Sequence, residues 1–166
     1  MTEPEFQPER MLEVLQRHGV RFVLIGGFAA VIHGSPYVTF DIDVVPERGA
    51  RNFERLSAAL DELHARVWTS SEPEGIPFGH DEDSLARVAV WNLVTDFGRL
   101  DLTLEPSGTR GYDDLARDAV HLAILGTEVD VASLADVIRS KEAADRDKDR
   151  LVLPVLRRIL ASGGAG

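Results

Sequence analysis

The sequence contains no cysteine, which excludes disulfide bonds, thiolate metal sites and cysteine nucleophiles. It also has little lysine: Lys141 and Lys148 are the only two, beside 16 arginines. No apolar run approaches the roughly 20 residues that span a bilayer, and the acidic start of the chain lacks the basic-then-apolar order of a signal peptide. We therefore expect a cytoplasmic protein with no membrane contact.

Positive charge is scarce as well, because 28 acidic residues outnumber 18 basic ones and the net charge is −10. Such a chain is a poor candidate for coating duplex DNA, whose phosphates attract basic surfaces. The 166 residues, 44% of them hydrophobic, suit one globular domain. We predict a single domain over 1–166, with a core over about 20–131 and a helical C-terminal segment over about 132–161.

Segments with helical apolar spacing alternate with short runs of β-forming residues, which predicts an α/β (α+β) fold. The acidic stretch 70–83 contains proline and glycine and predicts a loop, while Pro154 suits the first turn of the last helix. The predicted helices are 9–17, 28–33, 51–64, 112–117, 134–144 and 151–160, and the predicted strands are 21–25, 37–45, 66–69, 85–94, 99–104, 120–125 and 128–131.

The most informative local pattern is a glycine pair, Gly26 and Gly27, followed after a short helix by Asp41 and Asp43. Residues two apart in a strand face the same side, so both carboxylates, and Thr39 before them, share one face. Two such charges repel unless solvent or a divalent cation lies between them, and carboxylate oxygens suit Mg²⁺ (or Mn²⁺). Glycines that open a helix let backbone N–H groups approach an anion. This arrangement gives a triphosphate a place between the glycines and the carboxylates.

A third carboxylate, Asp101, alternates with Leu100 and Leu102 and therefore lies on the polar face of a half-buried strand. If that strand lies beside the strand of Asp41 and Asp43, three carboxylates converge. Such a cluster holds two metals about 3.5–4 Å apart in phosphoryl transfer. Each motif has an ordinary structural explanation when taken alone: a turn for the glycine pair, a solvated strand edge for Asp41 and Asp43, and a solvent-facing side chain for Asp101. The order of the motifs along the chain favours a functional site.

The stretch 22–45, with Gly26, Gly27, Asp41 and Asp43, resembles the nucleotidyltransferase superfamily, whose fold is that of the DNA polymerase beta palm. It is most similar to the small bacterial branch that includes AbiEii-type and toxin–antitoxin nucleotidyltransferases. The resemblance implies a central mixed sheet flanked by helices, with further C-terminal helices. It also implies that the glycines hold phosphates, that Asp41 and Asp43 bind metal, and that Asp101 ligates metal and helps activate an attacking hydroxyl. The implied reaction transfers a nucleoside monophosphate to that hydroxyl and releases pyrophosphate.

Both lysines lie in the C-terminal part, where Lys141, Asp145 and Lys148 share one face if a single helix runs through them. A solvated helix face with ion pairs explains this spacing, and so does contact of Lys141 and Lys148 with the triphosphate. The resemblance implies that Lys141 and Asp149 complete the site. Three other residues are expected to have structural roles: His33 in its turn, and Trp68 and Trp91 in the core.

Three classes of function remain open. The resemblance implies a toxin-like transferase that acts on RNA, at the tRNA 3′ end, with a cognate antitoxin protein as partner. The same chemistry on a protein or a small molecule, such as an antibiotic or a sugar, is the second class. The third is a non-catalytic nucleotide-binding partner in a two-protein module. The acidic net charge mildly disfavours RNA, and the complete acidic triad disfavours the non-catalytic binder. The small size leaves little room for a domain that grips tRNA, which a partner or a dimer would supply.

Overall fold

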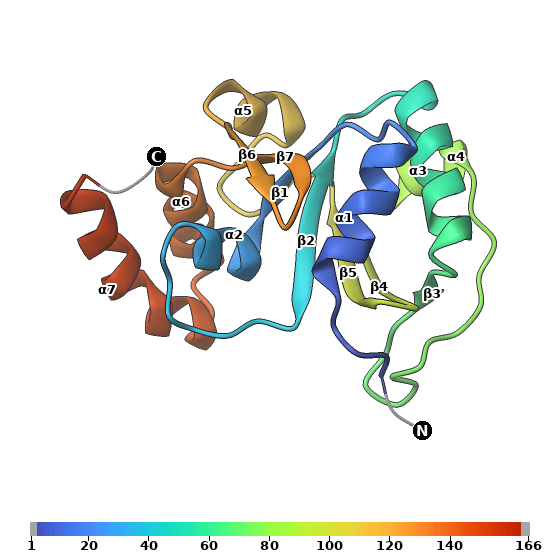
Figure 1. Ribbon diagram of the computed structural model, residues 1–166, viewed down its shortest axis with the longest axis horizontal. Coiled ribbons are helices and arrows are strands. Elements are labelled where there is room, and N and C mark those ends of the chain that lie inside the picture. The colour runs from blue at the N-terminus through green and yellow to red at the C-terminus, as the bar shows by residue number, and fades with distance from the viewer. Residues whose placement is uncertain (1–2, 164–166) are drawn as a thin grey trace.

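The computed structural model describes residues 3–163 and is built on a seven-stranded mixed sheet in the order β3-β4-β5-β2-β1-β7-β6 (Figure 1). In Figure 1, α1, α3 and α4 lie to the right, and α2, α6 and α7 lie to the left. The helices are α1 (Pro8–Arg17), α2 (Gly26–Ile32), α3 (Ala50–Glu62), α4 (Glu82–Arg87), α5 (Tyr112–Arg117), α6 (Leu134–Ala144) and α7 (Asp147–Ala161). The strands are β1 (Phe22–Ile25), β2 (Asp41–Pro46), β3 (Arg66–Val67), β4 (Val90–Thr95), β5 (Gly98–Thr103), β6 (Val120–Ile124) and β7 (Thr127–Val131).

The pairing of the central strands positions the predicted site. Strand β2 runs antiparallel to β1 and parallel to β5, in a register that places Asp43 beside Asp101. On the opposite face of these strands, Ile42 and Leu100 are completely buried in the core. The alternation seen in the sequence thus separates a polar face from an apolar one. The predicted mixed sheet, its flanking helices and its C-terminal helices are all present.

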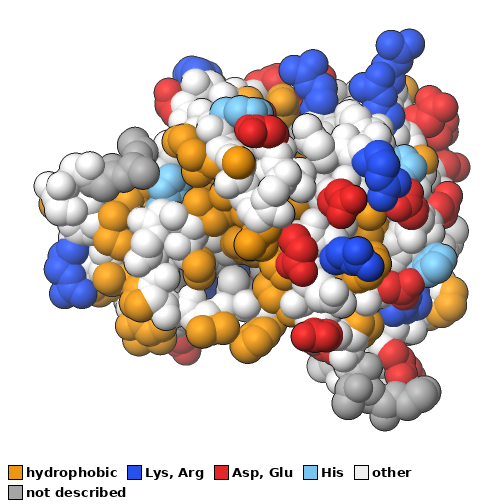
Figure 2. All heavy atoms as spheres, viewed as in Figure 1, with side chains coloured by type: hydrophobic (Ala, Val, Ile, Leu, Met, Phe, Trp, Pro, Cys, Tyr) orange, Lys and Arg blue, Asp and Glu red, His pale blue; other side chains and the backbone are white. Residues whose placement is uncertain are grey.

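The predicted strand 37–45 is shorter than expected, because residues 37–40 form an irregular loop and β2 begins at Asp41. Asp41 pairs with Arg99, and β5 begins only one residue earlier, at Gly98. On the other side, β1 pairs only as far as Asp43, because α2 begins at Gly26. Residues 37–40 therefore have no strand on the β1 side and at most one residue of β5 to pair with. Figure 2 shows apolar side chains along the lower edge of the molecule, where Figure 1 has this loop.

The predicted strand 85–94 is also wrong at its start, because α4 occupies 82–87 and β4 begins at Val90. A capping box explains the helix: the Ser84 backbone N–H donates to the Asp81 side chain at 2.8 Å, and the Asp81 N–H donates to the Ser84 hydroxyl at 2.9 Å. The stretch 70–81 has no helix or strand, as expected, although Ile76 forms one bridge to Val67.

The C-terminal segment forms two helices and therefore does not present one continuous helical face. Asp145 adopts a left-handed conformation (φ 50°), which ends α6, and α7 begins at Asp147. Lys141 and Lys148 therefore belong to different helices, contrary to the single-helix interpretation. Pro154 lies inside α7 and not in its first turn, because the helix starts four residues earlier than the predicted start at 151. No helix in residues 3–163 is long and apolar enough to cross a membrane.

Candidate active site

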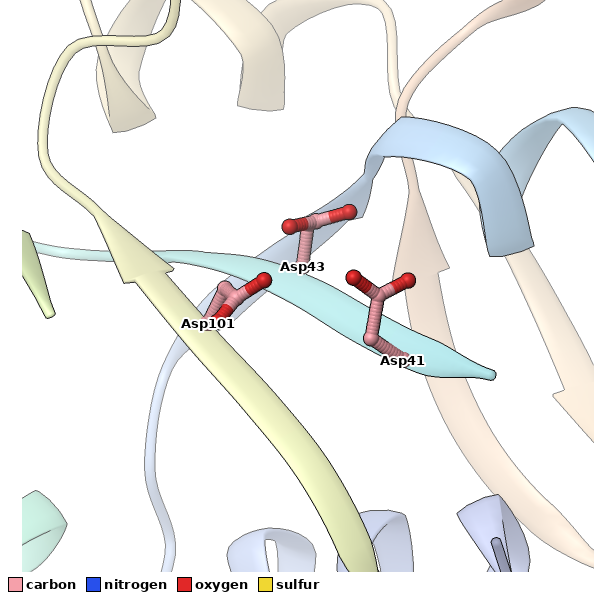
Figure 3. A group of neighbouring side chains, drawn as sticks. All are labelled: Asp41, Asp43 and Asp101. Atoms are coloured by element: carbon pink, nitrogen blue, oxygen red, sulfur yellow. The ribbon is translucent and has the colours of Figure 1, made fainter. Parts of the chain in front are cut away.

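Asp41, Asp43 and Asp101 converge at the centre of the sheet. Their side chains rise from β2 and β5 on the same face, with their carboxylates turned toward one another (Figure 3). One oxygen from each lies within 4.8 Å of the others. These are the only three carboxylates of residues 3–163 grouped closely enough with one another to share a metal ion. Hard oxygen ligands in this number fit Mg²⁺ or Mn²⁺, which complete their coordination with water and phosphate oxygens.

The electrostatics of the triad favour a cation. Burial, followed by the charges of Asp41 and Asp101, raises the pKa of Asp43 to about 8. Burial and the Asp41 charge raise the pKa of Asp101 to about 6, although Arg99 acts in the opposite direction. Without a metal, the folded protein therefore holds protons that three free aspartates would release. A divalent cation can replace those protons and neutralise the same charges.

Gly26 is required at its position by the carboxylate beside it. The residue has a φ of +79°, and a β-carbon there would lie 2.1 Å from Oδ2 of Asp43. A side chain at Gly27 would lie 3.2 Å from the Thr39 hydroxyl oxygen, a tight but less severe contact. The Thr39 hydroxyl in turn donates to Oδ1 of Asp41 at 2.9 Å. The glycine pair therefore lets the start of α2 lie against the two carboxylates of β2.

Three cationic side chains come from the junction of α6 and α7. Lys141, Arg146 and Lys148 line the same pocket as the triad. Lys141 is 8% exposed and its Nζ lies 3.5 Å from Oδ1 of Asp149. Burial lowers the pKa of Lys141, while the nearby Asp149 carboxylate opposes that shift.

Asp149 itself is fully buried and does not line the pocket. Its Oδ2 accepts a hydrogen bond from Nε of Arg146 at 2.7 Å. Burial would raise the pKa of Asp149, but the hydrogen bonds from Arg146 and the charge of Lys141 outweigh it and lower that pKa. The predicted pair Lys141 and Asp149 is thus in contact. Lys141 and Arg146 line the pocket, and Asp149 is buried behind them.

The pocket over the triad has a volume of about 480 Å³ and a chemically mixed lining. The two glycines and Thr39 line it together with the three cations of the α6–α7 junction. The neutral part of the lining is Val90 and Asn92 of β4, Thr103 of β5, and Pro106 and Ser107 after β5.

Sequence reasoning missed Arg99, whose Nη2 donates to Oδ1 of Asp101 at 3.1 Å. The signal was available, because a residue two positions before Asp101 in a strand shares its face. Trp68 is not the core residue expected: its ring covers the Arg99 guanidinium, with Cζ 3.8 Å from the ring centroid. Trp91 is partly buried against the core, as predicted. His33 is structural as expected, since it is buried and its Nε2 bonds the Ala132 carbonyl at 2.8 Å.

Neither a protein-family model nor a curated protein matches the sequence, but solved structures match the fold. The lincomycin-bound lincosamide antibiotic adenylyltransferase LnuA matches with a TM-score of 0.61 and 13% identity, over 93% of this chain and 99% of that one. The putative nucleotidyltransferase TM1012 from Thermotoga maritima matches with a TM-score of 0.52 and 15% identity, over 96% and 97%. The antibiotic-resistance factor ANT(2'')-Ia matches with a TM-score of 0.56 and 16% identity, over 95% and 82%. The chain therefore has a nucleotidyltransferase fold.

Proposed function

We propose that this protein transfers a nucleoside monophosphate from an NTP to a hydroxyl acceptor, with release of pyrophosphate and with Mg²⁺ or Mn²⁺ as cofactor. The observation that carries the proposal is the convergence of Asp41, Asp43 and Asp101 in one pocket with a glycine turn and three cations. A metal held by two or three carboxylates and a phosphate-binding surface are the two parts that phosphoryl transfer needs. The nucleotidyltransferase fold of the chain supports the same conclusion.

Each group in the pocket has a role in this reaction. Asp41 and Asp43 would hold the metal, and the Thr39 hydroxyl keeps Asp41 in place. When bound, the metal would supply positive charge at the reacting phosphate and at the leaving pyrophosphate. Gly26 and Gly27 let the start of α2 lie close to Asp43 and Thr39, and the backbone N–H groups there would bind the triphosphate.

The remaining groups act on the triphosphate and on the attacking hydroxyl. Lys141 and Lys148 neutralise the charge of the triphosphate, and Asp149 keeps Lys141 oriented toward it. Asp101 would help to hold the metal and would accept the proton of the attacking hydroxyl, whose pKa the metal would lower. Catalysis on this scheme rests on positioning and electrostatic stabilisation.

The acceptor has two candidate classes. RNA, at the tRNA 3′ end, remains the prediction from the resemblance, together with a toxin-like role and a cognate antitoxin. A small hydroxylated molecule is favoured by the neutral part of the pocket lining, which includes Asn92, Thr103 and Ser107. Within residues 3–163 the lysines and arginines that line the pocket all come from the α6–α7 junction. Two of the proteins with the same fold are also described as antibiotic-modifying or antibiotic-resistance proteins.

The first test measures label transfer from each of four α-³²P-labelled NTPs, with Mg²⁺ present, to total tRNA, to lincomycin and to a total cell lysate. We expect transfer by the wild type, and we expect Asp41→Asn to lower the rate at least about 100-fold because a metal ligand is lost. Asp118→Asn, an exposed aspartate outside the pocket, is the matched control and should keep the wild-type rate.

The products identify the acceptor. Label that RNase removes establishes RNA, protease-sensitive label establishes a protein, and label that resists both but migrates as a small molecule establishes the second class. Equal transfer by wild type and Asp41→Asn would refute the site assignment. Binding of nucleotide without transfer to any acceptor would favour the non-catalytic partner.

A further inference from the structure

Arg99 is built into the catalytic face of the sheet beside Asp101. It stands two residues earlier on β5, and its side chain is only 16% exposed. Its Nη2 donates to Oδ1 of Asp101 at 3.1 Å, and its Nε donates to the Leu93 carbonyl of β4 at 3.2 Å. Arg99 thus holds one oxygen of this carboxylate, which also lies close to Asp41 in the triad.

Trp68 holds Arg99 in this position. Its backbone N–H donates to the Asn92 carbonyl at 2.9 Å, which places Trp68 next to β4 on the far side of Arg99 from β2. The Arg99 guanidinium lies 3.8 Å from the centroid of the indole ring, a cation–π contact. The indole Nε1 donates to Oε1 of Glu3 at 2.5 Å, so the ring is itself tied in place. The guanidinium has a partner on each side and little freedom to rotate.

We propose that Arg99, clamped beneath Trp68, is a positioning residue that fixes the orientation of Asp101 for nucleotidyl transfer. This inference rests on the proposed function. Three carboxylates lie together, and Arg99 is a cation in contact with one of them. It therefore competes with a metal for the charge of Asp101 while directing Oδ2 toward the reacting groups. Removal of Arg99 should therefore raise the metal affinity of the site and lower the rate of transfer, because Asp101 is no longer oriented.

The test compares Arg99→Met, Arg99→Lys and Trp68→Leu with the wild type. Mn²⁺ affinity is measured by electron paramagnetic resonance without nucleotide, and transfer is measured under saturating Mg²⁺. Arg99→Met should bind Mn²⁺ about tenfold more tightly, because the competing charge is gone. It should also lose about 10- to 100-fold in kcat, because Asp101 is no longer held. A variant that is only destabilised would instead lose both Mn²⁺ affinity and kcat.

Arg99→Lys separates charge from geometry. Lysine keeps the charge but lacks the planar guanidinium, so Mn²⁺ affinity should stay near the wild-type value while kcat still falls. Trp68→Leu should change both quantities in the same direction as Arg99→Met, by smaller factors. Arg66→Met is the matched control: Arg66 lies on the same face, 22% exposed, and pairs with Asp96 and not with the triad. It should change neither quantity, and thermal melting checks that every variant is folded.

A second readout requires no turnover. In a Trp91→Phe background, tryptophan fluorescence reports Trp68 alone, and Mg²⁺ should change its emission through Arg99. Arg99→Met should abolish that change while still binding metal. The proposal is overturned if Arg99→Met keeps the wild-type Mn²⁺ affinity and Trp68 emission is insensitive to Mg²⁺. If instead these two effects are present but no acceptor is labelled, the proposed transfer fails and the Arg99 clamp stands as a feature of the metal site.

Discussion

At the residue scale, the site depends on close contacts that permit few substitutions. Gly26 combines a positive φ with the carboxylate of Asp43 at the position of a missing side chain. The pKa of Asp43 is raised chiefly because the residue is buried beside other acids. Both residues are unfavourable for stability without a ligand, which is common where strain or charge serves a function.

The two glycines should differ in their tolerance of alanine. Gly26→Ala forces Asp43 to move and places alanine in a left-handed conformation, so we expect a loss of about 1–3 kcal/mol in unfolding free energy together with loss of metal binding. Gly27→Ala meets only the Thr39 hydroxyl, at 3.2 Å, and should cost less. Urea unfolding and Mn²⁺ titration of both variants measure the difference. Similar losses in the two variants would contradict the role given to Gly26.

The raised pKa of Asp43 predicts a pH dependence of stability without metal. The carboxyl titrates at about 8 in the folded protein, well above the value of 3.8 for an ordinary aspartate. The folded state therefore holds one more proton than the unfolded state between these values, and stability falls as pH rises from about 4 to about 8. Asp43→Asn removes this loss, so in EDTA the variant should be more stable than wild type at pH 8 and similar near pH 4.

Urea unfolding at the two pH values, with Asp118→Asn as the control, measures this effect. Added Mg²⁺ should stabilise the wild type at pH 8 but have less effect on Asp43→Asn. If Asp43→Asn and the wild type are equally stable at pH 8, the Asp43 carboxylate is not destabilising.

At the scale of elements, the junction of α6 and α7 delivers cations to the pocket by burying a carboxylate. Asp145 turns the chain in a left-handed conformation, and Asp149 in the first turn of α7 accepts hydrogen bonds from Arg146. The same Asp149 lies beside Lys141 from the preceding helix. One buried acid therefore sets the relation between the two helices and the direction of two cations.

Removal of that acid should be costly. Asp149→Ala leaves Lys141 buried without its counter-charge, so we expect about 3–5 kcal/mol of destabilisation, measured by urea unfolding. The double variant Lys141→Met with Asp149→Leu should recover much of that stability, because no buried unpaired charge remains and Arg146, which also loses its partner, is more than half exposed. Transfer should stay low. Full stability of Asp149→Ala alone would indicate that Lys141 escapes to solvent.

At the scale of the whole molecule, the proposed function requires an acidic chain to bind an anionic substrate beside three carboxylates. The net charge of −10 and the triad both repel a triphosphate in the absence of a metal. The cations of the α6–α7 junction offset this repulsion only in part. Nucleotide and metal should therefore bind cooperatively.

Thermal unfolding tests this cooperativity. ATP and Mg²⁺ together should raise Tm by more than the sum of their separate effects, and EDTA should cancel the gain. A ligand at 100 times its Kd contributes about 2.7 kcal/mol to the folded state, which shifts Tm measurably in a protein of this size. The cooperativity should vanish in Asp41→Asn. An ATP effect of equal size in EDTA would mean that nucleotide binds away from the triad.

Much of the site was predictable because its determinants are local. The spacing of Asp41 and Asp43 in a strand places them on one face whatever the surroundings, and the alternation of leucines around Asp101 does the same. The pairing of β2 with β5, on which the convergence depends, is a long-range contact that no local pattern specifies. The resemblance supplied that step, and the structure bears it out.

The sequence by itself determined the alternation of elements, the acidic balance and the faces that carry the three carboxylates. Only the tertiary structure decided where strands begin and end, because a strand such as β2 begins close to the point where its neighbours β1 and β5 can pair with it. It also decided which side chains meet across the chain: Trp68 over Arg99, and Lys141 beside Asp149. These contacts join segments that periodicity treats as independent, since hydrogen bonds and burial between distant residues follow from packing and not from local preference.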